Sequence, residues 1–247
     1  MTLDGTNTWL LIEPGSARAV CVDPGPDHPG HRAALIDAAD QAGARIELIL
    51  LTHGHLDHSE GARALHEQTG ASVLAADPAH RLGGEGLQGG QVIREGGLEL
   101  VVVATPGHTS DSLSFLLTGD PALPTRVPTL LTGDTVLGRG STMVAYPDGD
   151  LSQYLESLGK LGELVGAVVH MVLPGHGPVL PDAAAAVEKY TAHRRARLAA
   201  VAQALAAGHT SVADVVAVVY ADVPQALRPA AELSVRAQLA YLGRLHD

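Results

Sequence analysis

The chain has 247 residues, and 46% of them are hydrophobic, which excludes a disordered protein and allows one large domain with a small appendage. No apolar run approaches the roughly 18 residues of a membrane span, and no signal peptide opens the sequence, so we expect no membrane partner. The net charge of -11 and the 3% of aromatic residues argue against a general nucleic-acid binder, because phosphate contacts need Lys and Arg. The single cysteine, Cys21, cannot form an internal disulfide, which predicts a reducing, cytoplasmic setting.

The first part of the chain alternates strand and helix patterns. Apolar runs at 7–12 and 19–23 end in Pro and Gly turns and predict two short strands, and the helical spacing over 30–42 predicts a helix. A continuous Leu and Ile run at 46–52 is typical of a strand that is covered on both faces. A helix over 60–68 and a strand from Ser72 complete this block.

The middle of the chain carries strands with no long helix between them. Gly and Pro turns separate four apolar segments, at 91–93, 98–104, 112–118 and 129–132. Asp150 is expected to cap a helix in which leucines recur every three or four residues, and a strand over 167–173 follows, with His170 as a core residue. Two blocks of strands with helices on the outside predict a layered α/β sandwich.

The character of the sequence changes after Pro181. An Ala-rich helix is expected over 183–207, between Asp182 and Gly208, and two further helical patterns follow at 212–220 and 225–245. The loss of strands, together with the shift to a slightly basic segment, predicts a domain boundary at Pro181. We therefore divide the chain into an α/β domain over 1–181 and a helical domain over 182–247. The helical domain is expected to pack beside the α/β domain or to form a homodimer contact.

A run of polar residues follows the apolar strand at 46–52. His53, His55, Asp57 and His58 stand within six positions, directly where that strand ends. Residues two apart on an extended chain point the same way, so His53 and His55 can aim their imidazoles at one point, with the other two beside them. Imidazole and carboxylate ligands together suit zinc, and also iron or manganese. The run therefore predicts ligands for two neighbouring metal ions.

Three more candidate ligands follow predicted strands. His108, Asp134 and His176 each come directly after a glycine that lets the backbone turn at the end of a strand. Because α/β folds build their sites at strand ends, we expect these side chains to join the first cluster.

With these motifs in place, the sequence up to about Pro181 resembles the metallo-β-lactamase-fold superfamily. The resemblance implies a four-layer αββα sandwich with two Zn²⁺ ions, Fe or Mn being the alternatives. A single-iron persulfide dioxygenase of the same superfamily is a less favoured interpretation. The ligands that the resemblance implies are His53, His55 and His108 for one metal, Asp57, His58 and His176 for the other, and Asp134 as the bridge.

Both ends of the chain are similar to one group within that superfamily. The opening segment Thr2–Trp9, the run His193–Arg195 and the final helical pattern resemble the beta-lactamase-like protein 2 family. This resemblance implies that residues 182–247 form a small winged-helix-like C-terminal domain. Members usually have a further strand before the opening segment, so we expect either a longer natural chain or a sheet that lacks one edge strand.

Two divalent ions give such a site the chemistry of a hydrolase. Metal-bound water loses its proton near pH 7, so a bridging hydroxide is the expected nucleophile, and Asp57 is expected to orient it or accept its proton. The resemblance offers two substrate classes, and we expect a small anionic ester or thioester, with single-stranded RNA as the alternative. A DNA-binding regulator that uses the C-terminal helices is the least favoured hypothesis, because no basic recognition stripe is visible there.

Four further side chains are candidates for substrate contacts. Ser141 and Thr142 follow Asp134 in a Gly-rich loop and can donate hydrogen bonds to a substrate, although a plain loop is an equal interpretation. His193 and Arg194 lie on the expected long helix and can hold an anionic substrate group. A solvated or inter-domain helix face is the favoured interpretation of this pair.

Overall fold

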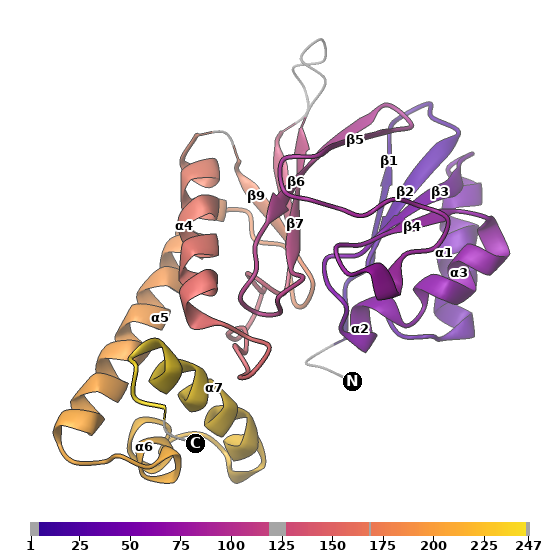
Figure 1. The fold of residues 1–247 in the computed structure, drawn as a ribbon. Helices are drawn as coiled ribbons and strands as arrows, with labels where there is room; N and C mark the ends of the chain where they lie inside the picture. Colours follow the sequence, from indigo (N-terminus) through magenta and orange to yellow (C-terminus); the bar gives the residue numbers. More distant parts are fainter. Residues whose placement is uncertain (1–4, 119–126, 168, 246–247) are drawn as a thin grey trace.

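The computed structural model of the protein describes residues 5–118, 127–167 and 169–245 (Figure 1). Residues Thr2–Asp4 of the opening segment therefore lie outside the described part of the chain. Within it, no helix is long and apolar enough to cross a membrane.

The described strands form two sheets. The first has the order β1-β2-β3-β4, in which β1 is an antiparallel edge strand and the others are parallel. The second has the order β5-β6-β7-β8-β9, antiparallel except for the parallel pair β8 and β9. The strands are β1 (Trp9–Ile12), β2 (Arg18–Val22), β3 (Arg45–Leu50), β4 (Ser72–Leu74), β5 (Val92–Glu95), β6 (Leu98–Ala104), β7 (Leu113–Thr118), β8 (Thr129–Gly133) and β9 (Met171–Pro174).

Helices cover the outer face of each sheet. Figure 1 shows α1 (Pro29–Gln41) and α3 (Ala62–Thr69) outside the first sheet, with α4 (Leu151–Ala167) and α5 (Ala183–Ala206) outside the second. A short helix, α2 (Leu56–Ser59), and a 3₁₀ turn, η1 (Pro78–His80), stand in the connections around β4. The expected four-layer αββα sandwich is confirmed.

The alternation of side chains along the inner strands creates this layering. In β2, Ala19 and Cys21 pack toward the helices, whereas Val20 and Val22 pack toward the other sheet. All four are fully buried. Strand β3 divides in the same way between the two clusters, as expected for a continuous apolar run that is covered on both faces.

The C-terminal region is helical, as expected. Asp182 caps the N-terminus of helix α5, and its carboxylate accepts a hydrogen bond from the backbone N–H of Ala185. The first half of α5 packs on α4, while its second half forms a separate core with α6 (Val212–Val219) and α7 (Arg228–Tyr241). The 3₁₀ turn η2 (Gln225–Leu227) precedes α7, so the helical pattern expected over 225–245 divides into these two elements. One helix therefore spans both cores, and the boundary at Pro181 stays a prediction.

One expected strand is shorter than its apolar run. Helix α4 extends to Ala167, and β9 begins only at Met171, so His170 is exposed rather than part of the core. The prediction for this residue was wrong because a short apolar run does not distinguish a helix end from a strand. Val165 and Val169 both pack into the core under α4, which explains why the run looked continuous.

Phe115 tests the packing between the two sheets. It is the single phenylalanine of the chain and is fully buried in β7, among apolar side chains of both sheets. We expect Phe115→Ala to lower the free energy of unfolding by about 3–5 kcal/mol, since a large cavity would remain. Urea denaturation measures this loss. The control Val218→Ala alters a half-exposed side chain of α6 and should change stability by less than about 0.5 kcal/mol. Equal effects of the two substitutions would contradict the assignment of the core.

Candidate metal centre

The seven candidate ligands come together at one edge of the sandwich. Each follows the end of a strand or stands in α2, and the two sheets both contribute. Their ligand atoms form groups in which every atom lies within 4.8 Å of the others. These groups are His53, His55 and His108; His53, His58 and Asp134; and Asp57, His58 and His176.

The first group consists of imidazoles that face one another. Nε2 of His53 lies 3.0 Å from Nδ1 of His55, and Nε2 of His108 lies 3.1 Å from the same Nδ1 atom. His53 and His108 are buried, whereas His55 is exposed at the mouth of the site. Three imidazole nitrogens at this spacing match the donor set of a zinc ion.

The second group joins two imidazoles and a carboxylate. Nε2 of His176 lies 3.3 Å from Nε2 of His58 and 3.4 Å from Oδ2 of Asp57. His58 and His176 are fully buried. Asp57 and His58 stand inside the helix α2 rather than ahead of the helix expected from residue 60, and one short turn brings both toward the centre.

Asp134 lies between the two groups. Its Oδ2 is 3.6 Å from Nε2 of His108 and 3.4 Å from Nε2 of His176, while its Oδ1 is 3.4 Å from Nε2 of His58. Oδ1 is buried and accepts no hydrogen bond from any described residue. A buried carboxylate oxygen without a hydrogen bond is costly, and a bound cation would satisfy it. The donor set therefore fits a pair of metal ions that share this carboxylate.

Glycine is required at two of the turns that carry ligands. A Cβ atom on Gly175 would lie 2.6 Å from Oδ1 of Asp134 and 2.8 Å from Cε1 of His58. Gly133 has a φ of 49°, and a Cβ there would lie 2.5 Å from Oγ1 of Thr52. These glycines permit close approach of the backbone to the centre as well as a sharp turn.

The outward nitrogens of the ligand imidazoles are held by hydrogen bonds. Nδ1 of His108 donates to the carbonyl of Met143 at 2.7 Å, and Nδ1 of His176 donates to the carbonyl of Gly5 at 2.8 Å. Nδ1 of His58 donates to Oδ2 of Asp23 at 2.9 Å. Such contacts fix the tautomer and direct Nε2 of each ring inward.

Asp23 is a functional residue that the sequence reasoning missed. It is buried, it has a φ of 52°, and its Oδ1 accepts a hydrogen bond from the backbone N–H of Thr52 at 2.8 Å. Its Oδ2 accepts hydrogen bonds from His58 and from the Thr52 hydroxyl, which in turn lies 3.0 Å from Nδ1 of His53. Asp23 thus supports an imidazole in each ligand group. The available signal was a carboxylate at the end of an apolar strand, which resembles an ordinary turn.

The opening segment holds the loop of His176. The side-chain amide of Asn7 donates to the carbonyls of Pro174 and Gly177, at 3.0 and 2.8 Å, and the Trp9 indole donates to Pro174 at 3.1 Å. The part of the opening segment that the structure describes therefore has a structural role at the metal centre.

The two ligand groups differ in their affinity for protons. Burial lowers the pKa of His53 well below its ordinary value and also lowers the pKa of His108. Burial opposes the charge on His58 and His176 as well, but the carboxylates around them outweigh it and raise the pKa of each to about 10. Burial likewise opposes the charge on Asp134, yet the His176 and His58 imidazoles beside it hold its pKa well below the usual range.

The candidate substrate residues lie around the loop after Asp134. Thr142 is buried, and its hydroxyl donates to the carbonyl of Asp134 at 2.6 Å, while Ser141 is exposed. Arg194 is buried and donates from Nη2 to the carbonyl of Thr142. His193 is half-buried, and its Nδ1 has no hydrogen-bond partner among the described residues. A contact of these four residues with substrate stays a prediction.

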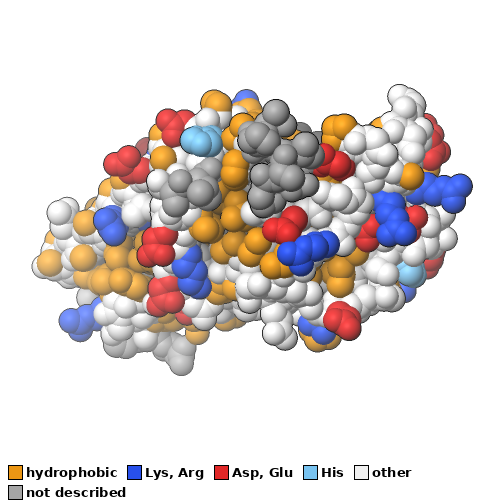
Figure 2. Space-filling model, turned by 90° about the horizontal axis from the view of Figure 1, so that it is seen from above, with side chains coloured by type: hydrophobic (Ala, Val, Ile, Leu, Met, Phe, Trp, Pro, Cys, Tyr) orange, Lys and Arg blue, Asp and Glu red, His pale blue; other side chains and the backbone are white. Residues whose placement is uncertain are grey.

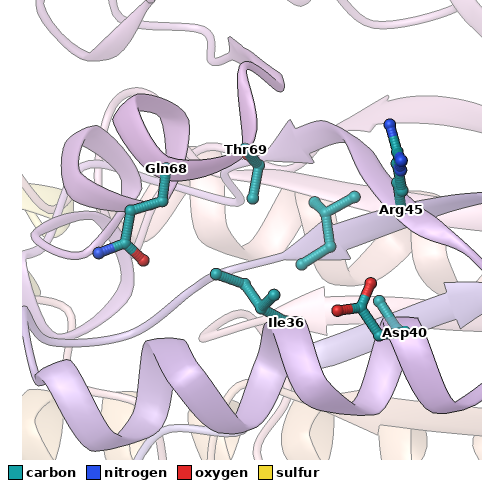
Figure 3. Close-up of a pocket in the computed structure, with 7 residues that line it drawn as sticks. Ile36, Asp40, Arg45, Gln68 and Thr69 are labelled. Carbon is teal, nitrogen blue, oxygen red and sulfur yellow. The ribbon is translucent and has the colours of Figure 1, made fainter.

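A separate surface pocket lies at the opposite end of the first sheet from the candidate ligands. It has a volume of about 330 Å³ between α1, α3 and the start of β3. Figure 3 shows Asp40 and Arg45 on one side of it, with Gln68 and Thr69 on the other. Since Arg45 begins β3 and His53 follows its opposite end, this pocket is separate from the metal centre.

Comparisons with known proteins agree with this geometry. Residues 1–176 match the family described as the metallo-beta-lactamase superfamily, and residues 211–244 match the beta-lactamase associated winged helix domain. The beta-lactamase-like protein 2 homolog of Drosophila melanogaster is 32% identical over 98% of this chain and 83% of its own length. An atrochrysone carboxyl ACP thioesterase of Aspergillus fumigatus is 34% identical over 74% of this chain and 54% of its own length.

Solved structures resemble the whole fold. A metallo-beta-lactamase family protein of Thermus thermophilus has a TM-score of 0.75 at 24% identity, covering 96% of this chain and 88% of that one. A beta-lactamase domain protein of Burkholderia ambifaria has a TM-score of 0.77 at 22% identity, covering 98% and 83%. At this identity the likeness concerns the fold alone.

Asp23 allows a test of the support behind the ligands. We expect Asp23→Asn to weaken metal binding by about 10- to 100-fold, because an amide oxygen is a poorer acceptor for the His58 ring than a carboxylate. Competition with a chromophoric chelator measures the affinity. The control Asp27→Asn changes an exposed aspartate near the start of α1 and should leave the affinity unchanged. A wild-type affinity in Asp23→Asn would contradict the role given to this residue.

The protonation of the second group predicts how metal binding depends on pH. The carboxylates around His58 and His176 raise the pKa of each to about 10, so protons compete with a metal ion for the Nε2 atoms of this pair. We expect zinc affinity to rise with pH through neutrality, with release of up to about two protons for the ion at this group. Calorimetry in buffers of different ionisation enthalpy counts the protons. Binding without proton release at neutral pH would contradict the raised pKa values of His58 and His176.

Proposed function

The chain belongs to the metallo-beta-lactamase superfamily, and we propose that it is a two-zinc hydrolase of a small ester or thioester. The observation that carries the proposal is the buried carboxylate of Asp134 between two groups of inward-facing ligand atoms. A carboxylate in that position suits a bridge between two cations, which is the usual geometry of two-metal hydrolysis.

The ligand assignment follows the two groups. His53, His55 and His108 would hold one ion, Asp57, His58 and His176 the other, and Asp134 both. Ions bound there would polarise a substrate carbonyl and activate water at neutral pH, with zinc favoured by the imidazole-rich set and Fe or Mn as alternatives.

Two aspartates have different tasks in this proposal. Asp134 is an anion at all ordinary pH values, since its pKa is held well below the usual range, so its charge stays available to the metals. Asp57 is more open, with 25% of its side chain exposed against 10% for Asp134. We therefore assign to Asp57 the orientation of the attacking water and acceptance of its proton, because a base must reach the solvent side of the centre.

The surroundings of the site favour an acyl substrate. Met143, whose carbonyl accepts the hydrogen bond from Nδ1 of His108, is 38% exposed beside the site. Apolar side chains at the mouth of a site suit an acyl or aromatic group near the cleaved bond. The ACP thioesterase among the relatives agrees with this choice.

Charge disfavours a polyanionic substrate. The net charge is -11, and Figure 2 shows Lys and Arg scattered among Asp and Glu on one face rather than gathered in a stripe. RNA binding depends on such a stripe and on counterion release. Cleavage of single-stranded RNA is therefore the alternative outcome of the test below.

The proposal is tested with purified wild-type protein and two aspartate variants. We expect wild-type protein to bind about two metal ions and to hydrolyse acyl thioesters, and Asp134→Ala to lose both properties. Asp148→Ala, which alters an exposed carboxylate beyond the loop that follows Asp134, should retain both properties. Metal analysis and thiol release measure the two properties. Full activity of Asp134→Ala with two metals would refute the mechanism.

A parallel assay on unstructured RNA decides the substrate class. We expect thioester turnover that changes little with added salt, and no RNA cleavage. If the protein cleaves RNA and not thioesters, and its affinity for RNA falls steeply with added salt, RNA would replace the proposed substrate.

A further inference from the structure

Residues 134–143, here called the ligand loop, connect two of the candidate ligands. The loop begins with Asp134 itself, and near its end the carbonyl of Met143 accepts a hydrogen bond from Nδ1 of His108 at 2.7 Å. The hydroxyl of Thr142 donates to the carbonyl of Asp134 at 2.6 Å, which closes the loop on itself. A shift of this loop therefore changes the orientation of both His108 and Asp134.

Side chains of α4 and α5 hold the ligand loop from outside. The Tyr154 hydroxyl donates to the carbonyl of Thr135 at 2.6 Å, and the Tyr190 hydroxyl accepts from the backbone N–H of Leu137 at 2.9 Å. Arg194 of α5 donates from Nη2 to the carbonyl of Thr142. The three contacts lie at the beginning, the middle and the end of the ligand loop. Arg194 holds its end, next to the carbonyl that His108 contacts.

The environment of Arg194 is unusual for an arginine. Its side chain is 6% exposed, its guanidinium carbon lies 4.9 Å from the centre of the Tyr154 ring, and its buried Nε has no hydrogen-bond partner among the described residues. The described part of the chain provides no carboxylate paired with it. Burying the guanidinium costs desolvation free energy, which packing alone would not require, because an apolar side chain could fill the same space.

We propose that Arg194 is a positioning residue of the metal centre, which holds the ligand loop by the Thr142 carbonyl and so orients His108 and Asp134. The C-terminal helical region thereby completes the metal site through α5. This inference rests on the proposed function, because it needs metals at these ligands. Metal binding by the wild-type protein tests the proposed function, and the comparison of variants tests the inference.

The same helix offers a matched control. Arg197 stands three residues after Arg194, lies 4.7 Å from the centre of the Tyr220 ring, and donates from Nη1 to the carbonyl of Val219. It thus makes the same two kinds of contact as Arg194, but with residues of the C-terminal core. If α5 only required an arginine stacked on a tyrosine for its stability, substitution of either arginine would have the same effect on metal binding.

The experiment compares Arg194→Met, Arg194→Lys and Arg197→Met in the full-length protein. With Zn²⁺ and Co²⁺ as probes, we expect Arg194→Met to bind metal about 10- to 100-fold more weakly and to alter the absorption spectrum of bound Co²⁺. Arg194→Lys retains one donor toward Thr142 and should recover part of the affinity. Arg197→Met should lower the melting temperature and leave metal affinity and spectrum unchanged. Wild-type affinity and spectrum in a folded Arg194→Met, or equal losses in both methionine variants, would overturn the inference.

A milder variant covers the case in which Arg194→Met does not fold. Tyr190→Phe removes only the hydroxyl that contacts Leu137 and Gly140 on the same loop. We expect it to shift the Co²⁺ spectrum and to weaken metal binding several-fold in the same direction, and an unchanged centre would overturn the inference. If wild-type protein binds no metal at all, the proposed function fails and the inference falls with it.

Discussion

A buried carboxylate surrounded by imidazoles is the constraint on which the rest of the structure depends. Asp134 has Nε2 atoms of three histidines within 3.6 Å, and one of its oxygens accepts no hydrogen bond among the described residues. Removing such a group from water is costly unless positive charge compensates it. The His58 and His176 imidazoles, whose pKa values are raised to about 10, lie beside this charge, and metal ions bound to them would also compensate it. The same interaction thus accounts for the raised pKa values of the two imidazoles and for the proposed binding of metal ions.

The fold keeps this cluster together from several directions. The ligands stand at strand ends of both sheets, so the apolar core between the sheets fixes how far apart the two halves of the site lie. The two ends of the chain then hold the ligand-bearing loops. Asn7 and Trp9 hold the loop of His176, and Arg194 holds the loop that joins Asp134 to the carbonyl behind His108. Segments far from one another in sequence therefore determine the orientation of single imidazoles.

The layers, and the gathering of the seven candidate side chains at one place, could be predicted from the sequence because both depend on local patterns. Alternating or continuous apolar runs identify strands and their buried faces, and a ligand directly after a strand and a glycine is placed by the end of that strand. Features that depend on contacts between residues far apart in the sequence could not be predicted. Asp23 looked like a turn residue, since its contacts with Thr52 and His58 arise only when β2 and β3 pair. His170 lay within the apolar run 167–173, which begins in α4 and ends in β9. Thr142 and Arg194 were considered for substrate binding, yet their visible contacts are with the protein, across 52 residues of sequence.

Anomalous diffraction from crystals grown with zinc tests the central claim most directly. The account predicts two peaks at the zinc edge, one among His53, His55 and His108 and the other among Asp57, His58 and His176, with Asp134 between them. Absence of zinc from this cluster, or a single ion that leaves Asp134 without a metal contact, would contradict the account.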